Sequence, residues 1–126
     1  MTRVLAIEDN AGDAYLIQHA LSGLSFPVDL MVARDGEEAI KLLSDVGAIP
    51  DLIILDINIP KIDGHSVLER VGPIASPVVV FSSSSDPREI KRARELGARQ
   101  CISKPGDLEE FTSVVQGMVL QYVKRA

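Results

Sequence analysis

The chain has 126 residues, enough to bury one core, and we expect a single domain over residues 1–126. Its net charge of −5 argues against nucleic acid as the main ligand, and its one cysteine, Cys101, excludes an internal disulfide and most cysteine-based zinc sites. No apolar run approaches the roughly 20 residues that span a membrane, and the N-terminus turns acidic too early for a signal peptide, so we expect a cytoplasmic protein with no membrane contact.

Five short apolar runs follow one another at a spacing of about 24 residues, which predicts repeated strand–helix units. Most are continuous and rich in Val and Ile, as expected for strands of a parallel sheet that helices cover on both faces. The second run alternates more and is therefore placed nearer an edge of the sheet. In chain order the predicted strands are 4–7, 28–32, 52–55, 78–81 and 101–103.

The segments between and after these runs have helical periodicity, which makes the chain an α/β protein. The second helix is expected to end at Gly47, and the fourth to begin with Asp86 as its N-cap and Pro87 in its first turn. Asp107 and Glu110 have the spacing of a capping box at the start of the fifth helix. The predicted helices are 11–24, 35–47, 64–71, 85–98 and 106–126.

The apolar side chains of these helices are interpreted as core. In the first helix, Tyr15 belongs to the apolar spacing and is assigned to the core rather than to a contact surface. The fifth helix carries an apolar stripe that is assigned to the core in the same way. That stripe consists of Leu108, Phe111, Val115, Met118 and Tyr122.

Polar residues directly follow four of the predicted strands. Glu8 and Asp9 follow the first, Asp56 the third, Ser82 the fourth and Lys104 the fifth. Because ligands of open parallel sheets bind beyond the carboxyl ends of the strands, we expect these side chains to meet at one edge. Converging carboxylates repel one another, and a hard divalent cation such as Mg²⁺ relieves that repulsion. With an ammonium opposite, such a pocket suits a phosphoryl group that a carboxylate oxygen attacks and a hydroxyl contacts.

In this order and spacing, the sequence resembles the CheY-like receiver domain of two-component response regulators over essentially its whole length. The resemblance rests on Glu8–Asp9, on Asp56 within "DLIILDINIPKIDG", on Ser82 and on Lys104–Pro105. It implies a flavodoxin-like (βα)5 fold, with a five-stranded parallel sheet in the order 2-1-3-4-5 and helices on both faces. It further implies a response regulator without an output domain, and "LDINIPKIDG" and "KPGDLEEF" look closest to stand-alone regulators, including those associated with phytochromes.

The resemblance also implies a magnesium site. Asp9, Asp56 and the backbone carbonyl of Asn58 would bind Mg²⁺ directly, and Glu8 would act through a water molecule. These are oxygen ligands, which Mg²⁺ prefers.

The same likeness assigns roles in a phosphorelay. Asp56 would be the phosphoacceptor, Lys104 would pair with the phosphoryl group, and Ser82 would be the hydroxyl that turns inward to meet it. The bond between Lys104 and Pro105 would be cis. Phosphate would come from a sensor histidine kinase or a phosphotransfer protein, and the signal would leave by phosphorylation-dependent binding to a downstream protein. The chain would catalyse only its own phosphorylation and dephosphorylation, and would otherwise not be an enzyme.

Some positions depart from the family or leave two interpretations open. Cys101 stands where receivers commonly have an aromatic residue that moves with the switch, so the usual coupling is in question; as a small core residue, it needs no redox role. Asn58 and Ser84 are candidates for setting the lifetime of the phosphoryl group. The fourth helix and its end carry a basic face that is either solvated or a surface for a partner or a homodimer. This face consists of Arg88, Lys91, Arg92, Arg94 and Arg99.

Two other functions are weighed against phosphorylation-dependent signalling. The first is a receiver fold that docks partners without phosphorylation, which the complete set of acidic, hydroxyl and lysine residues argues against. The second is an enzyme of flavodoxin-like fold that binds a nucleotide or flavin. Against it, the loop "EDNAGDA" lacks the Gly-rich or Ser/Thr-rich cradle that a phosphate site requires.

Overall fold

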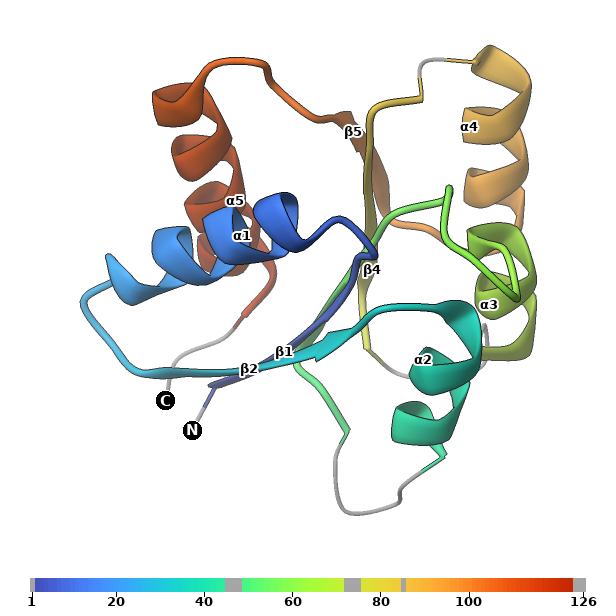
Figure 1. Ribbon diagram of the computed structural model, residues 1–126, viewed down its shortest axis with the longest axis horizontal. Coiled ribbons are helices and arrows are strands. Elements are labelled where there is room, and N and C mark those ends of the chain that lie inside the picture. Colours follow the sequence, from blue (N-terminus) through green and yellow to red (C-terminus); the bar gives the residue numbers. More distant parts are fainter. Residues whose placement is uncertain (1, 45–48, 72–75, 85, 124–126) are drawn as a thin grey trace.

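Five parallel strands form a single sheet in this computed structural model, which describes residues 2–44, 49–71, 76–84 and 86–123 (Figure 1). The order across the sheet is β2-β1-β3-β4-β5, which confirms the predicted α/β class and the flavodoxin-like order. The second strand lies at an edge, as its alternating sequence predicted. The strands are β1 (Thr2–Ile7), β2 (Val28–Ala33), β3 (Leu52–Leu55), β4 (Val78–Ser82) and β5 (Gln100–Ser103).

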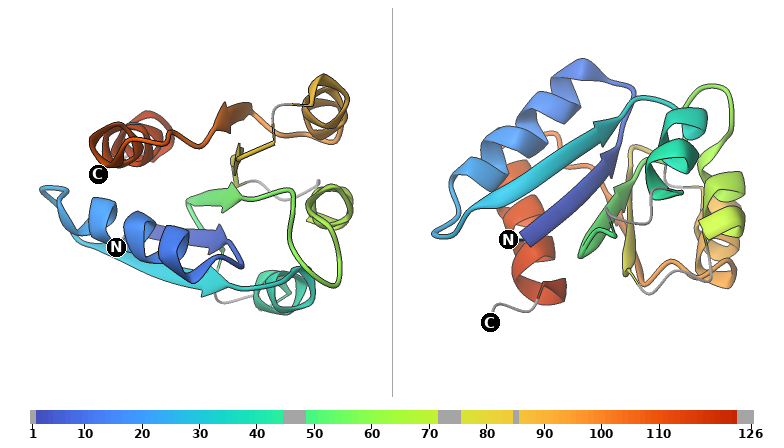
Figure 2. Two further views of the ribbon diagram at one scale, coloured as in Figure 1. Left: turned by 45° about the horizontal axis from the view of Figure 1, so that its top comes forward. Right: turned by 90° about the horizontal axis from the view of Figure 1, so that it is seen from below.

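Helices cover both faces of the sheet. Two of them, α1 (Ala11–Ser22) and α5 (Leu108–Tyr122), pack together on one face. On the other face lie α2 (Gly36–Leu43), α3 (Gly64–Val71) and α4 (Pro87–Glu95) (Figures 1 and 2). Within the described parts of the chain, no helix combines the length and apolarity needed to cross a membrane.

The central strands contribute side chains to two separate cores, because successive side chains of a strand point to opposite faces of the sheet. Leu5 and Ile53 pack with the α2, α3 and α4 side, whereas Val4 and Leu52 pack with α1 and α5. Every residue of β3 and β4 is buried, which confirms that helices cover these strands on both sides. The carboxyl ends of the strands are thereby held at fixed positions relative to one another.

The helix caps follow the sequence signals, with one exception. Asp86 caps α4 and Asp107 caps α5 through side-chain oxygens, as predicted. The prediction that the second helix reaches Gly47 is wrong, because α2 ends at Leu43. At its end the backbone N–H and hydroxyl of Ser44 both donate to the Ile40 carbonyl, at 3.0 and 2.8 Å. Gly47 itself lies outside the described residues.

Two side chains assigned to the core are exposed. Tyr15 is 65% exposed and stacks on His19, because α1 turns Ile17, Ala20 and Leu21 toward the sheet instead. Leu108 is 56% exposed at the first position of α5, outside the apolar cluster that includes Phe111 and Val115. The remainder of the predicted stripe points inward: Phe111, Val115 and Met118 are buried and Tyr122 is half-buried.

Candidate functional site

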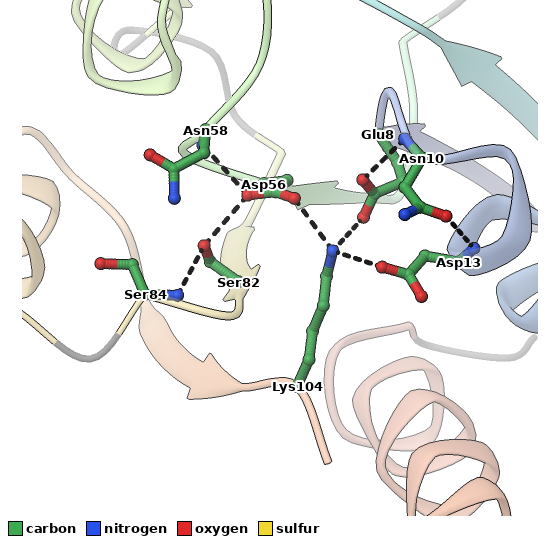
Figure 3. Close-up of polar contacts among 8 residues, drawn as sticks. All are labelled: Glu8, Asn10, Asp13, Asp56, Asn58, Ser82, Ser84 and Lys104. Carbon is green, nitrogen blue, oxygen red and sulfur yellow. Dashed lines mark hydrogen bonds and ion pairs between the residues drawn. The ribbon is translucent and has the colours of Figure 1, made fainter. Parts of the chain in front are cut away.

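The structure brings the strand-end residues together at one edge of the sheet (Figure 3). Asp56 and Ser82 are buried there, and backbone hydrogen bonds continue the sheet ladder to the site. The Asp56 N–H donates to the Ile7 carbonyl at 3.0 Å, and the Lys104 N–H donates to the Ser82 carbonyl at 2.9 Å. Asp56, Ser82 and Lys104 are therefore placed by the ends of strands rather than by free loops.

Lys104 lies at the centre of the acidic residues. Its ammonium donates to Glu8 Oε1 at 2.5 Å, to Asp13 Oδ2 at 2.9 Å and to Asp56 Oδ2 at 2.9 Å (Figure 3). An ammonium has three N–H donors, so this arrangement uses all of them. Burial lowers the pKa of Lys104, but the hydrogen bonds to the three carboxylates outweigh burial and raise the pKa above its usual range. The side chain therefore stays charged.

Asp13 is the member of this cluster that the sequence analysis missed. It lies in the first turn of α1, where its N–H donates to the Asn10 side chain that caps the helix. It also precedes the buried Ile17 by four residues, which puts both on one face of the helix. This spacing, and the start of the helix directly after Glu8 and Asp9, are the sequence features from which Asp13 could have been predicted to lie at the site.

Asp56 has a different set of partners on each oxygen. Oδ2 accepts from Lys104, whereas Oδ1 accepts from the Asn58 N–H and from the Ser82 hydroxyl, both at 3.0 Å. The Ser82 hydroxyl oxygen in turn accepts from the Ser84 N–H at 3.2 Å. Ser82 was expected to turn inward to a phosphoryl group, and its hydroxyl already points at Asp56 here (Figure 3).

Glu8, Asp9 and Asp56 form a group that could hold a divalent cation. One oxygen from each lies within 4.8 Å of the others. Oxygens about 2.1 Å from one Mg²⁺ are about 3.0–4.2 Å apart, so these side chains could supply ligands to the ion by moving closer together. Burial raises the pKa of the Glu8 carboxyl to about 7; the Lys104 hydrogen bond lowers it and the Asp56 charge raises it. The role expected of the Asn58 carbonyl stays a prediction.

The loop after Asp56 is anchored to the start of α2. The Gly36 N–H donates to the Pro60 carbonyl at 3.3 Å, and a Cβ at Gly36 would lie 2.0 Å from the Ile62 carbonyl oxygen. Lys61 has a left-handed φ of 67° and its ammonium lies 3.5 Å from Asp35. This close approach holds in place the segment that carries the phosphoacceptor candidate.

The expected cis bond between Lys104 and Pro105 is wrong: the bond is trans. The two isomers of a bond before proline differ by only about 1 kcal/mol, so the sequence position does not impose cis. With the trans bond, Lys104 still reaches all three carboxylates.

The lesser candidates occupy the α3–α4–β5 side of the molecule. Cys101 is half-buried, with its sulfur 4.0 Å from the Ile90 carbonyl, and it helps line a cavity of about 10 Å³ next to Ser82. His65 lies in α3, and its Nε2 is 2.9 Å from the Glu89 carbonyl in α4. The basic residues of α4 and the following turn are all exposed: Arg88, Lys91, Arg92, Arg94 and Arg99. Their role in docking stays a prediction.

Known proteins are similar to this chain in sequence and in fold. The family model for the response regulator receiver domain matches residues 4–116. The response regulator Rcp1 of Synechocystis sp. is 31% identical over 124 residues, covering 91% of this chain and 84% of its own. The crystal structure of its Mn²⁺-bound form superposes with a TM-score of 0.88 at 27% identity, covering 100% and 98% of the two chains. The phosphorylated cyanobacterial phytochrome response regulator RcpA superposes at 0.90 with 32% identity, covering 99% and 96%.

Proposed function

Since the chain belongs to the family of response regulator receiver domains of two-component systems, we propose that Asp56 accepts a phosphoryl group in a Mg²⁺-dependent reaction. The observation that carries this proposal is the set of partners around Asp56. Asp56 is buried and accepts hydrogen bonds from an ammonium and a hydroxyl, and one oxygen each of the buried Glu8 and the exposed Asp9 lies within 4.8 Å of an Asp56 oxygen. The crystal structure of phosphorylated RcpA shows that a relative 32% identical to this chain takes up phosphate, which supports the proposal.

The residues of the pocket have distinct roles in the proposed transfer. An oxygen of Asp56 forms a bond to phosphorus while the bond from phosphorus to the donor's oxygen or nitrogen breaks, and the electron pair leaves with the donor atom. Lys104 and Ser82 are hydrogen-bond donors already within reach of Asp56, so each can bind a phosphoryl oxygen without a large rearrangement. A divalent cation held by Asp9, Asp56 and the Asn58 carbonyl, with Glu8 acting through a water molecule, would offset the charge of the phosphoryl oxygens.

We propose Mg²⁺ as the resident cation because the three candidate ligands are carboxylates and no soft ligand is among them. Rcp1 was crystallised with Mn²⁺ bound, and Mn²⁺ has the same preference for oxygen ligands. The phosphodonor is a sensor histidine kinase or a phosphotransfer protein. The signal then passes to a separate protein that binds the phosphorylated form.

The lifetime of the phosphoryl group is assigned to residues beside Asp56. Asn58 follows Asp56 by two residues and is exposed at the pocket, and Ser84 follows Ser82 by two. The Ser84 hydroxyl donates to Glu89 Oε2 at 2.8 Å, which fixes the loop between β4 and α4. Because each follows a residue of the pocket by two positions, we propose that both side chains set the rate at which the acyl phosphate is hydrolysed.

The alternative function is a receiver fold that docks its partner without phosphorylation. The intact acidic group, Lys104 and Ser82 still favour the phosphorylation-dependent function.

The test is intact-mass measurement after incubation with acetyl phosphate or phosphoramidate, in Mg²⁺ and in EDTA. A single phosphoryl adduct is expected on the wild type in Mg²⁺ only, and Asp56→Asn should abolish it. Asp107→Asn is the matched control, since it removes one exposed carboxylate while Asn keeps the N-cap of α5. Failure of the wild type to form an adduct with any small donor or kinase, with cation binding confirmed, would favour phosphorylation-independent docking.

A further inference from the structure

Asp13, the third carboxylate that accepts a hydrogen bond from Lys104, has no role in the proposed reaction. We infer that Asp13 is a positioning residue for phosphoryl transfer, which holds the Lys104 ammonium in the pocket while its other two partners are engaged elsewhere. This inference rests on the proposed function, because it concerns the same site.

The argument begins with the fate of each Lys104 partner. Asp56 becomes the phosphoryl acceptor, so its bond to the ammonium must give way to one from a phosphoryl oxygen. Glu8 belongs to the group of carboxylates that lie within 4.8 Å of one another and suit a divalent cation. Among the described residues that bind the ammonium, Asp13 alone lies outside that group and does not take the phosphoryl group. It is therefore the partner that Lys104 can keep throughout the reaction.

The fold gives Asp13 a rigid support. Its backbone is fixed in the first turn of α1 by the Asn10 cap at 3.0 Å, and α1 is fixed to the sheet by the buried Ile17. The Asp13 side chain is 27% exposed, against 7% for Lys104, and its carboxylate lies beside the ammonium (Figure 3).

A fixed partner matters because of the chemistry of lysine. The ammonium is a point charge on a flexible stem, and its placement depends on what holds it. Groups held in the productive geometry before the reaction contribute far more to the rate than groups that must be ordered during it. Asp13 and Lys104 together thus present one preset N–H donor to the incoming phosphoryl oxygen.

A purely structural role for Asp13 makes different predictions. If the ion pair only joined α1 to the segment after β5, its loss would lower stability and leave the rate of the folded protein unchanged. The experiment therefore measures the phosphorylation rate, the Mg²⁺ affinity and the stability of each variant separately. The variants are Asp13→Asn, Asp13→Glu, Lys104→Met and the double variant Asp13→Asn/Lys104→Met, with Asp107→Asn as the charge control.

The rate constant of phosphorylation is measured by intact mass at saturating Mg²⁺ and phosphoramidate, and the Mg²⁺ Kd by calorimetry. Asp13→Asn should be about tenfold slower, which is the loss expected when one group is modestly misplaced. Its Mg²⁺ Kd should stay within about twofold of the wild type, since Asp13 lies outside the cation group. Asp13→Glu should recover most of the rate, and Asp107→Asn should match the wild type.

Two further readouts show whether Asp13 acts through Lys104. In the Lys104→Met background, Asp13→Asn should slow phosphorylation no further. In EDTA, where neither cation nor phosphoryl group is present, the urea midpoint shifts of Asp13→Asn and Lys104→Met should be non-additive, because the two side chains share one contact.

The inference is overturned by a wild-type rate for Asp13→Asn, by an equal loss in the Lys104→Met background, or by additive midpoint shifts. A parallel loss of Mg²⁺ affinity would also overturn it, since Asp13 would then belong to the cation group. These results differ from failure of the proposed function, in which the wild type itself forms no adduct.

Discussion

Replacing Lys104 by methionine tests whether the ammonium is the counter-charge that holds the pocket together. The side chain is 7% exposed and bonds to three carboxylates, of which those of Glu8 and Asp56 belong to buried residues. Removing one partner of a buried ion pair costs about 3–5 kcal/mol because the charge left behind has neither water nor a partner. Asp13 can turn to solvent, so the lower end of that range, about 3 kcal/mol, is expected for Lys104→Met in EDTA.

A divalent cation should reverse much of this loss. Mg²⁺ at about 100 times its Kd stabilises the folded state by about 2.7 kcal/mol. In the wild type the cation must compete with Lys104 for Glu8, whereas in Lys104→Met that competitor is gone. The variant should therefore bind Mg²⁺ at least as tightly as the wild type and gain more stability from it.

The assay is urea unfolding followed by circular dichroism, in EDTA and in saturating Mg²⁺. Lys61→Met is the matched control, because Lys61 is 58% exposed and its ion pairs are 3.5 and 3.9 Å long. Such a surface pair is worth at most about 1 kcal/mol. The reasoning about the counter-charge is wrong if, in EDTA, Lys104→Met lowers the free energy of unfolding no more than Lys61→Met does. It is also wrong if Mg²⁺ stabilises Lys104→Met and the wild type equally.

Two more predictions concern the basic face and the loop after Asp56. Arg92→Glu should weaken self-association or binding to an acidic partner, most clearly at low salt, and leave the phosphorylation rate unchanged. Light scattering measures the association and the mass assay measures the rate. Unchanged association would support a solvated face. Gly36→Ala should lower the free energy of unfolding by about 2–3 kcal/mol, because its Cβ would meet the Ile62 carbonyl oxygen at 2.0 Å. Urea unfolding measures this loss, and an unchanged free energy of unfolding would contradict the close approach.

The sequence predicted the strands and the position of the site because both depend on local pattern. Continuous apolar runs such as 52–55 identify strands buried on both faces, and residues placed directly after them must meet at one edge of a parallel sheet. This reasoning located Glu8, Asp56 and Lys104 without any structure.

What the sequence could not predict depends on how the helices sit on the sheet. Asp13 approaches Lys104 because α1 packs beside α5, and 91 residues separate the two in sequence. The exposure of Tyr15 follows from the rotation of α1 about its axis, which is decided by the burial of Ile17 and Ala20. The end of α2 at Leu43 was not predicted because apolar periodicity identifies a helix but does not resolve its last residues.

The contact of Ser82 with Asp56 links the carboxyl ends of two neighbouring strands, β3 and β4, through their side chains. The Ser82 hydroxyl and the Lys104 ammonium donate to different oxygens of Asp56. A group added to either oxygen must therefore displace one of these two donors. A chemical change at Asp56 thus reaches β4 or the segment after β5 directly, whatever side chain occupies position 101.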